Sequence, residues 1–129
     1  MKLGKLLKES QNHTFEAFSE EGKKYSVRVT PDPEKKHLKR ITDELFFVQY
    51  LAEAGLTHIC SPVPPLTHSP QKSFILVGDL IVAVFGWALG EPLSFMEFRW
   101  MNDKNVVRAW GRFIAQFHKI SKQFAKEYP

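Results

Sequence analysis

One long amphipathic helix constrains the fold most, because apolar residues recur at spacings of three and four within a single segment. Pro31 and Pro33 break the extended segment before it, and Asp32 or Glu34 is expected to open the helix with negative charge near its N-terminus. Gly55 stands where a helix C-cap glycine belongs. The apolar positions are Leu38, Ile41, Leu45, Val48 and Ala52, broadened by Phe47 and Leu51.

A hairpin is predicted before this helix, over residues 14–30, with a polar turn at 20–22 that contains glycine. In its second strand Tyr25, Val27 and Val29 share one face, because side chains alternate with a period of two. Ser26 and Arg28 therefore point to the other face, away from the apolar stripe. This alternation leaves a cation on the polar face of a strand.

A second hairpin is predicted after the helix. Residues 56–71 are expected to form a loop, since the prolines of 61–65 cannot supply ladder donors. Two apolar runs, 74–77 and 80–85, then flank Gly78 and Asp79, which mark a tight turn.

The carboxy-terminal part is predicted to be a turn-rich linker at 86–92 and a last helix that begins near Asn102 and Asp103, a good N-cap pair. The complete order is hairpin, helix, hairpin, linker, helix. It predicts an α+β fold, an antiparallel sheet packed by one long helix, followed by a C-terminal amphipathic helix. The apolar side of that last helix carries Val106, Trp110, Phe113, Ile114, Phe117, Ile120 and Phe124.

Composition limits the classes of partner and compartment. The 129 residues carry a net charge of +4 with the Lys and Arg residues scattered, which is typical of solvated faces and predicts no nucleic-acid partner. No apolar run approaches the roughly 18 residues of a membrane span, and the first ten residues lack the apolar core of a signal peptide. The lone Cys60 fits a reducing, cytoplasmic compartment. The histidines show no ligand spacing, so no metal site is predicted.

Six short strings, in this order and spacing, resemble the amino-terminal, nucleotide-binding lobe of the aminoglycoside phosphotransferase and choline-kinase-like family, whose fold is protein-kinase-like. The resemblance covers nearly the whole chain, and no single string is specific alone. The strings are NHTF at 12–15, YSVRV at 25–29, DELFFVQYL at 43–51, AEAG at 52–55 with PVP at 62–64, VFGWALGE at 84–91 and GRFIAQFH at 111–118.

The resemblance implies a division of the chain and a set of nucleotide-binding residues. Residues 1–85 would be the lobe, 86–101 the hinge and linker, and 102–129 the first helix of a second lobe that is otherwise absent. Arg28 would face the phosphates of ATP and Glu44, on the long helix, would hold it. Ser26 would line the adenine pocket, and adenine would meet the backbone of the hinge residues Val84, Phe85, Gly86 and Trp87.

Each of these residues also has an ordinary structural interpretation, which the sequence leaves open. Arg28 could be a solvated strand charge and Glu44 an exposed helix carboxylate. Ser26 could pack without touching a ligand, and residues 84–87 could be a plain strand end and turn.

Two departures from the family pattern restrict the function. The turn at 9–12, expected to cover the phosphates, has no glycine. The His-Gly-Asp catalytic loop and the later metal-binding Asp do not occur in these residues, so no catalytic residue is predicted, ATP binding is expected to be weak, and Mg²⁺ is expected only with a second lobe. The first hypothesis is thus an ATP-binding lobe of a small-molecule phosphotransferase, inactive alone. The alternatives are a non-catalytic module that self-associates through its last helix and, more weakly, a basic domain that binds nucleic acid.

Overall fold

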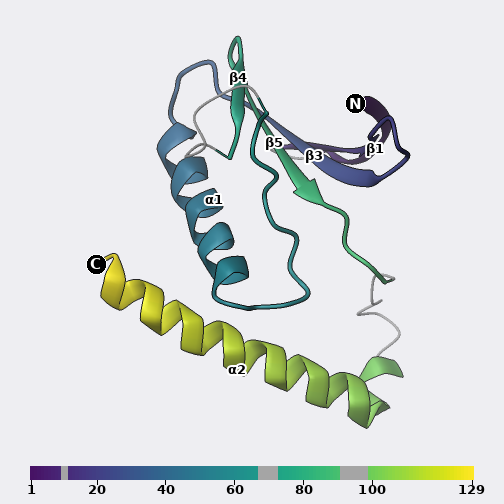
Figure 1. The fold of residues 1–129 in the computed structure, drawn as a ribbon, viewed down its shortest axis with the longest axis vertical. Coiled ribbons are helices and arrows are strands. Elements are labelled where there is room, and N and C mark those ends of the chain that lie inside the picture. The colour runs from purple at the N-terminus through teal and green to yellow at the C-terminus, as the bar shows by residue number, and fades with distance from the viewer. Residues whose placement is uncertain (10–11, 67–72, 91–98) are drawn as a thin grey trace. The chain divides into compact units, whose positions relative to one another are not determined.

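The computed structural model describes residues 1–9, 12–66, 73–90 and 99–129. The chain forms two compact units (Figure 1). The first unit contains Met1–Gln49 and Cys60–Ala88, and the second contains Tyr50–Ile59 and Leu89–Pro129. No helix of the described residues has the length and apolar character needed to cross a bilayer.

The first unit is built on an antiparallel sheet of five strands in the order β1-β2-β3-β5-β4. This sheet and the helix beside it confirm the predicted α+β class. Strand β1 lies before the two predicted hairpins and was not predicted from the sequence. The strands are β1 (Lys2–Glu9), β2 (His13–Phe18), β3 (Lys24–Pro31), β4 (Ile75–Val77) and β5 (Leu80–Gly86).

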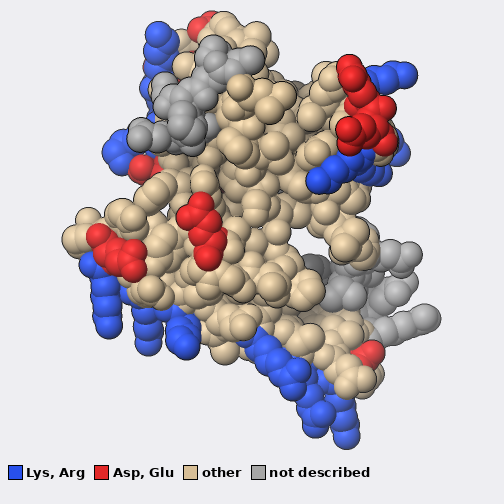
Figure 2. Space-filling view, viewed as in Figure 1, with Lys and Arg blue, Asp and Glu red and all other residues tan. Residues whose placement is uncertain are grey.

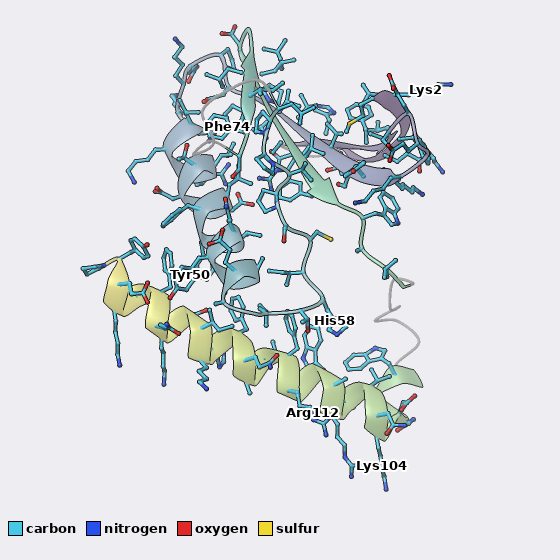
Figure 3. The ribbon with its side chains drawn as sticks, in the orientation of Figure 1. Lys2, Tyr50, His58, Phe74, Lys104 and Arg112 are labelled. Carbon is cyan, nitrogen blue, oxygen red and sulfur yellow. The ribbon has the colours of Figure 1, made fainter. Side chains whose placement is uncertain are left out.

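Helix α1 (Leu38–Glu53) packs on one face of this sheet. Ile41 and Leu45 of α1 form the core with Ile81 and Ala83 of β5 and with Phe74 just before β4 (Figure 3). In the ladder Ala83 pairs with Arg28, and residues paired across strands share a face. The face that carries Ser26 and Arg28 is therefore the face that α1 covers.

The predicted start of α1 was wrong, because the helix begins at Leu38 and not at Asp32 or Glu34. The carboxylate of Asp32 is buried and accepts hydrogen bonds from the backbone N–H groups of Lys36, at 2.8 Å, and His37, at 3.1 Å. Lys35 has φ of 55°, which no right-handed helix contains. Asp32 thus stabilises a turn before the helix, an alternative that Asp side chains commonly offer the backbone.

The predicted helix end was right. Gly55 has φ of 94°, its N–H donates to the Ala52 carbonyl, and the N–H of Leu56 donates to the Leu51 carbonyl. This pair of bonds is the Schellman motif, which requires the left-handed conformation that glycine adopts without strain. The hydrophobic contact that accompanies the motif is consistent with the burial of Leu51 and Leu56.

Both predicted hairpins are present, β2–β3 and β4–β5, the second turning at Gly78 with φ of 60°. The loop expected over 56–71 is partly wrong. The N–H of Val63 donates to the Val84 carbonyl at 2.7 Å, and the N–H of Gly86 donates to the Ser61 carbonyl at 3.1 Å. This short segment therefore pairs with β5. Its prolines lack N–H groups, but the pairing needs only the N–H of Val63 and the carbonyl of Ser61.

The second unit contains the 3-10 helix η1 (Arg99–Asn102) and helix α2 (Lys104–Glu127). Asp103 is the N-cap, as predicted, and its carboxylate accepts from the N–H groups of Asn105 and Val106.

The Tyr50 ring meets the Phe124 ring edge to face, with centroids 5.0 Å apart. Burial raises the pKa of the Tyr50 hydroxyl, as does its hydrogen bond to Glu127. Lys and Arg side chains project along one side of α2 (Figure 2).

Candidate functional site

The Arg28 guanidinium is the centre of the candidate site. Arg28 lies on β3, which is hydrogen-bonded to β2 on one side and to β5 on the other, so its side chain projects from a strand that is fixed at both edges. Its Nη1 donates to Oε1 of Glu44 at 2.7 Å. The Arg28 side chain is 19% exposed and that of Glu44 is 42% exposed. The structure therefore brings together the two charged residues that the sequence placed on a strand and on the next helix.

Two further features shape the environment of Arg28. Its Cζ lies 5.1 Å from the centre of the Phe85 ring, within the range of a cation–π contact. Its Nη2 is buried, and no residue that the structure describes accepts a hydrogen bond from it. A buried donor without an acceptor costs about 1–3 kcal/mol. An anionic oxygen that reached Nη2 would remove that cost, so the donor fits a phosphate group chemically.

The residues expected to form a hinge, 84–87, lie at the end of β5 and just beyond it. Ser26 pairs with Phe85 in the ladder, so Ser26 shares a sheet face with both Arg28 and Phe85. The N–H of Gly86 already donates to Ser61, which removes it as a free donor for a base. The Val84 carbonyl already accepts one bond from Val63 and retains a second lone pair.

Glu16 and Lys24 belong to the same sheet face and were missed by the sequence reasoning. Glu16 pairs with Ser26, its Oε2 lies 3.1 Å from Nζ of Lys24, and its Oε1 accepts the Lys5 N–H at 3.2 Å. Lys24 Nζ also lies 3.9 Å from the centre of the Trp87 ring. Alternation on β3 could have grouped Lys24 with Ser26 and Arg28, but Glu16 joins them only through the β2–β3 register.

The Glu16 carboxylate is electrostatically held in its charged form. The hydrogen bond from the Lys5 backbone lowers the pKa of Glu16, and the hydrogen bond and charge of Lys24 lower it further. The end of this face near Trp87 thus carries an ion pair rather than an apolar surface. A base bound there would meet the aliphatic stem of Lys24 and its charge near Trp87.

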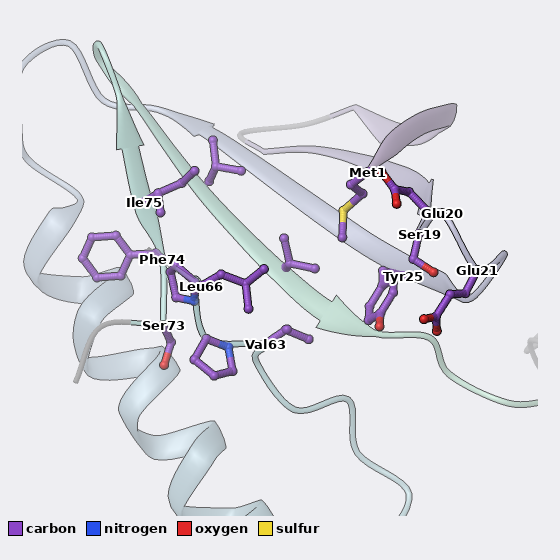
Figure 4. A pocket seen from close by; sticks show the side chains of 14 residues that line it. Met1, Ser19, Glu20, Glu21, Tyr25, Val63, Leu66, Ser73, Phe74 and Ile75 are labelled. Carbon is purple, nitrogen blue, oxygen red and sulfur yellow. The ribbon is translucent and has the colours of Figure 1, made fainter. Parts of the chain in front are cut away.

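A cavity of about 680 Å³ lies on the opposite face of the sheet, within the first unit (Figure 4). Tyr25, Val82 and Val84 line it, and alternation points these side chains away from the face of Arg28. Leu66 and Met1 extend toward the same space. The cavity is therefore separate from the candidate site.

The turn expected over the phosphates lies partly outside the described residues, at 10–11. Its last residue, Asn12, accepts a hydrogen bond from Thr30 Oγ1 at 2.7 Å. Across the described residues, no group of three or more His, Cys, Asp or Glu side chains could hold a metal ion. These side chains do not fit a Mg²⁺ ion by themselves, and ligands for it would have to come from elsewhere.

Comparison with known proteins supports the fold. No protein-family model matches the chain, and no curated protein matches it. A solved structure, that of the amicoumacin kinase hAmiN in complex with AMP-PNP, Ca²⁺ and Ami, is similar, with a TM-score of 0.60 and 18% sequence identity. The likeness covers 77% of this chain and 29% of that chain, so this chain spans less than a third of the kinase. It shows a kinase-like fold.

Proposed function

We propose that the chain is the ATP-binding lobe of a small-molecule phosphotransferase, an enzyme that moves the γ-phosphoryl group of ATP to a hydroxyl. The ion pair between Arg28 and Glu44 carries the proposal, because it places a fixed cation with a spare donor on the sheet face beside α1. Arginine stays charged and can hold two phosphate oxygens at once. The similar solved kinase holds an ATP analogue, which supports nucleotide as the ligand class.

Each residue has a specific role in this proposal. Arg28 neutralises charge on the phosphates, and Glu44 fixes the guanidinium so that little side-chain entropy is lost on binding. Ser26 and the backbone of Phe85 and Trp87 meet the adenine. Phosphoryl transfer depends mainly on positioning and charge neutralisation, and this lobe supplies part of both. Residues 1–85 form the lobe, 86–101 the hinge and linker, and 102–129 the first helix of a second lobe.

The chemistry itself is assigned to groups outside these residues. The sequence contains no His-Gly-Asp loop, and the described side chains do not fit Mg²⁺ by themselves. Residues 1–129 alone are expected to bind nucleotide without transferring phosphate. The acceptor specificity then belongs to the same missing groups.

Titration with ATP, followed by amide chemical shifts, tests this function. We expect millimolar or weaker affinity, roughly −4 kcal/mol or less favourable, with shifts at Ser26, Arg28 and residues 84–87. Adenosine should shift the hinge amides only, because it has no phosphates for Arg28 to meet. In the Arg28→Gln variant ATP should bind no better than adenosine.

Lys36→Gln is the matched control, since it removes one positive charge from an exposed side chain that pairs with Glu34. The control should keep the preference for ATP over adenosine. If Arg28→Gln also kept that preference, Arg28 would not be a phosphate-binding residue and the proposal would fail.

Self-association through α2 is a second candidate function. Trp110 is 59% exposed and Val107 is 45% exposed, and large apolar side chains in water often mark an interface. We expect light scattering to show a dimer whose share rises with concentration, and Trp110→Glu to return it to a monomer. A wild-type chain that stays monomeric across the concentration range would exclude this candidate.

A further inference from the structure

All the Lys and Arg residues of α2 lie on one side of the helix. With 3.6 residues per turn, they fall within an arc of about 80° and extend over roughly 33 Å of its length. In Figure 3 the labelled members, Lys104 and Arg112, project from the same side of α2. We call this set the basic stripe: Lys104, Arg108, Arg112, Lys119, Lys122 and Lys126.

The basic stripe is exposed, and its charges are not compensated by the described part of the chain. Every one of its side chains is exposed, and none takes part in an ion pair found among the described residues. Glu127 is the one acidic residue in the helical sequence, and its carboxylate accepts from Gln123. The lysines before and within α1 differ, since Lys36 and Lys39 pair with Glu34 and Asp43. The stripe is thus a continuous row of one sign, unlike an ordinary solvated face of mixed charge.

The opposite side of α2 is apolar and partly covered. Ile120 is buried, Phe113 and Phe117 are half-buried, and the Phe124 ring packs on Tyr50. A helix that inserts into a lipid surface must offer its apolar side to the bilayer. Here part of that side is covered, since Tyr50 packs on Phe124 and Ile120 is buried, whereas the basic side is exposed along its whole length.

We infer that the basic stripe binds the phosphodiester backbone of a nucleic acid. The cations form a narrow line, with one-turn spacings near the helix start. Such a line complements a linear polyanion better than it complements a broad charged plane such as a membrane surface. Binding releases counterions from the phosphates and needs no contact with base edges. The stripe itself contains no aromatic side chain that could stack on bases, so the binding is independent of sequence.

This inference reverses the sequence-based expectation of no nucleic-acid partner. That expectation treated the basic residues as scattered, whereas the observed bounds of α2 align a third of the chain's 18 Lys and Arg residues on one face. It does not depend on the proposed ATP site, which uses residues of the first unit.

Fluorescence anisotropy of the full chain with a random-sequence DNA duplex of about 20 base pairs tests the inference, since such a duplex is longer than the stripe. A single-stranded RNA and vesicles of phosphatidylcholine with phosphatidylserine are parallel probes. If all members of the stripe engage duplex DNA, affinity should fall by about a thousand-fold between 50 and 200 mM salt. The test variant replaces Arg108, Arg112 and Lys119 by Gln, and we expect its salt dependence to be roughly halved.

The matched control replaces Lys35, Lys36 and Lys39 by Gln, which removes the same net charge from exposed side chains that do not belong to α2. Circular dichroism checks that both variants keep their helices. The inference holds if the stripe variant loses nucleic-acid affinity and the control does not. Equal losses in both variants would show that net charge alone acts. Binding to anionic vesicles without binding to DNA or RNA, or no binding to any probe, would overturn the inference.

Discussion

Leu45→Ala is expected to lower the free energy of unfolding by about 3 kcal/mol, within the range of roughly 2–5 kcal/mol measured when Leu is truncated in a packed core. The Leu45 side chain is 1% exposed and packs with Ile41, Phe74, Ile81 and Ala83. Its removal leaves a cavity between α1 and the sheet, the contact that positions Glu44 beside Arg28. Urea unfolding measures the change, and a weaker ion pair should accompany it.

Leu89→Ala is the matched control, because the same atoms are removed from a side chain that is 98% exposed. Its effect on the free energy of unfolding should stay within about 0.5 kcal/mol. Similar losses at positions 45 and 89 would mean that α1 is not seated on the sheet as described.

Exchanging the two charges of the candidate site separates its structural role from its role in binding. Arg28→Glu alone places two carboxylates together on a face that α1 partly covers, and ATP binding should be lost. Because Glu44 is 42% exposed, water screens the pair, and we expect a loss of stability of about 1–2 kcal/mol rather than the larger cost of a fully buried pair.

The double variant Arg28→Glu with Glu44→Arg restores opposite charges at the same two positions. Its free energy of unfolding should recover most of that loss, as a double-mutant cycle measures. ATP binding should stay lost, because the cation now projects from the helix and not from the strand. Recovered ATP binding would show that any positive charge near this face suffices and that the position of Arg28 has no special role.

Local sequence signals predicted the ends and turns of the elements well. Gly55 ended α1, Asp103 capped α2, and Gly78 with Asp79 closed the β4–β5 hairpin. In each case the backbone groups that need a partner lie within a few residues of the side chain or glycine that satisfies them. The residues therefore act in the same way whatever the rest of the chain does.

Predictions failed where a distant segment of the chain supplied the hydrogen-bond partners of the backbone. Asp32 was expected to start a helix. Instead its buried carboxylate accepts the N–H of Lys36 in a turn, and its own backbone N–H donates to the carbonyl of Asp79. Ser61 and Val63 were assigned to a loop, but they pair with β5. Neither partner could be found from the residues themselves, because each lies more than twenty positions away in the sequence.

The candidate site shows the same division between local and distant information. Period-two alternation in the sequence placed Arg28 on the polar face of β3, and a helical period placed Leu45, the neighbour of Glu44, on the buried stripe of α1. The tertiary structure decided that these faces meet, through the packing of Leu45 on β5, and it brought Glu16 to Lys24 through the β2–β3 register. Alternation and helical period are properties of a single segment, whereas docking and register depend on which distant surfaces are buried together.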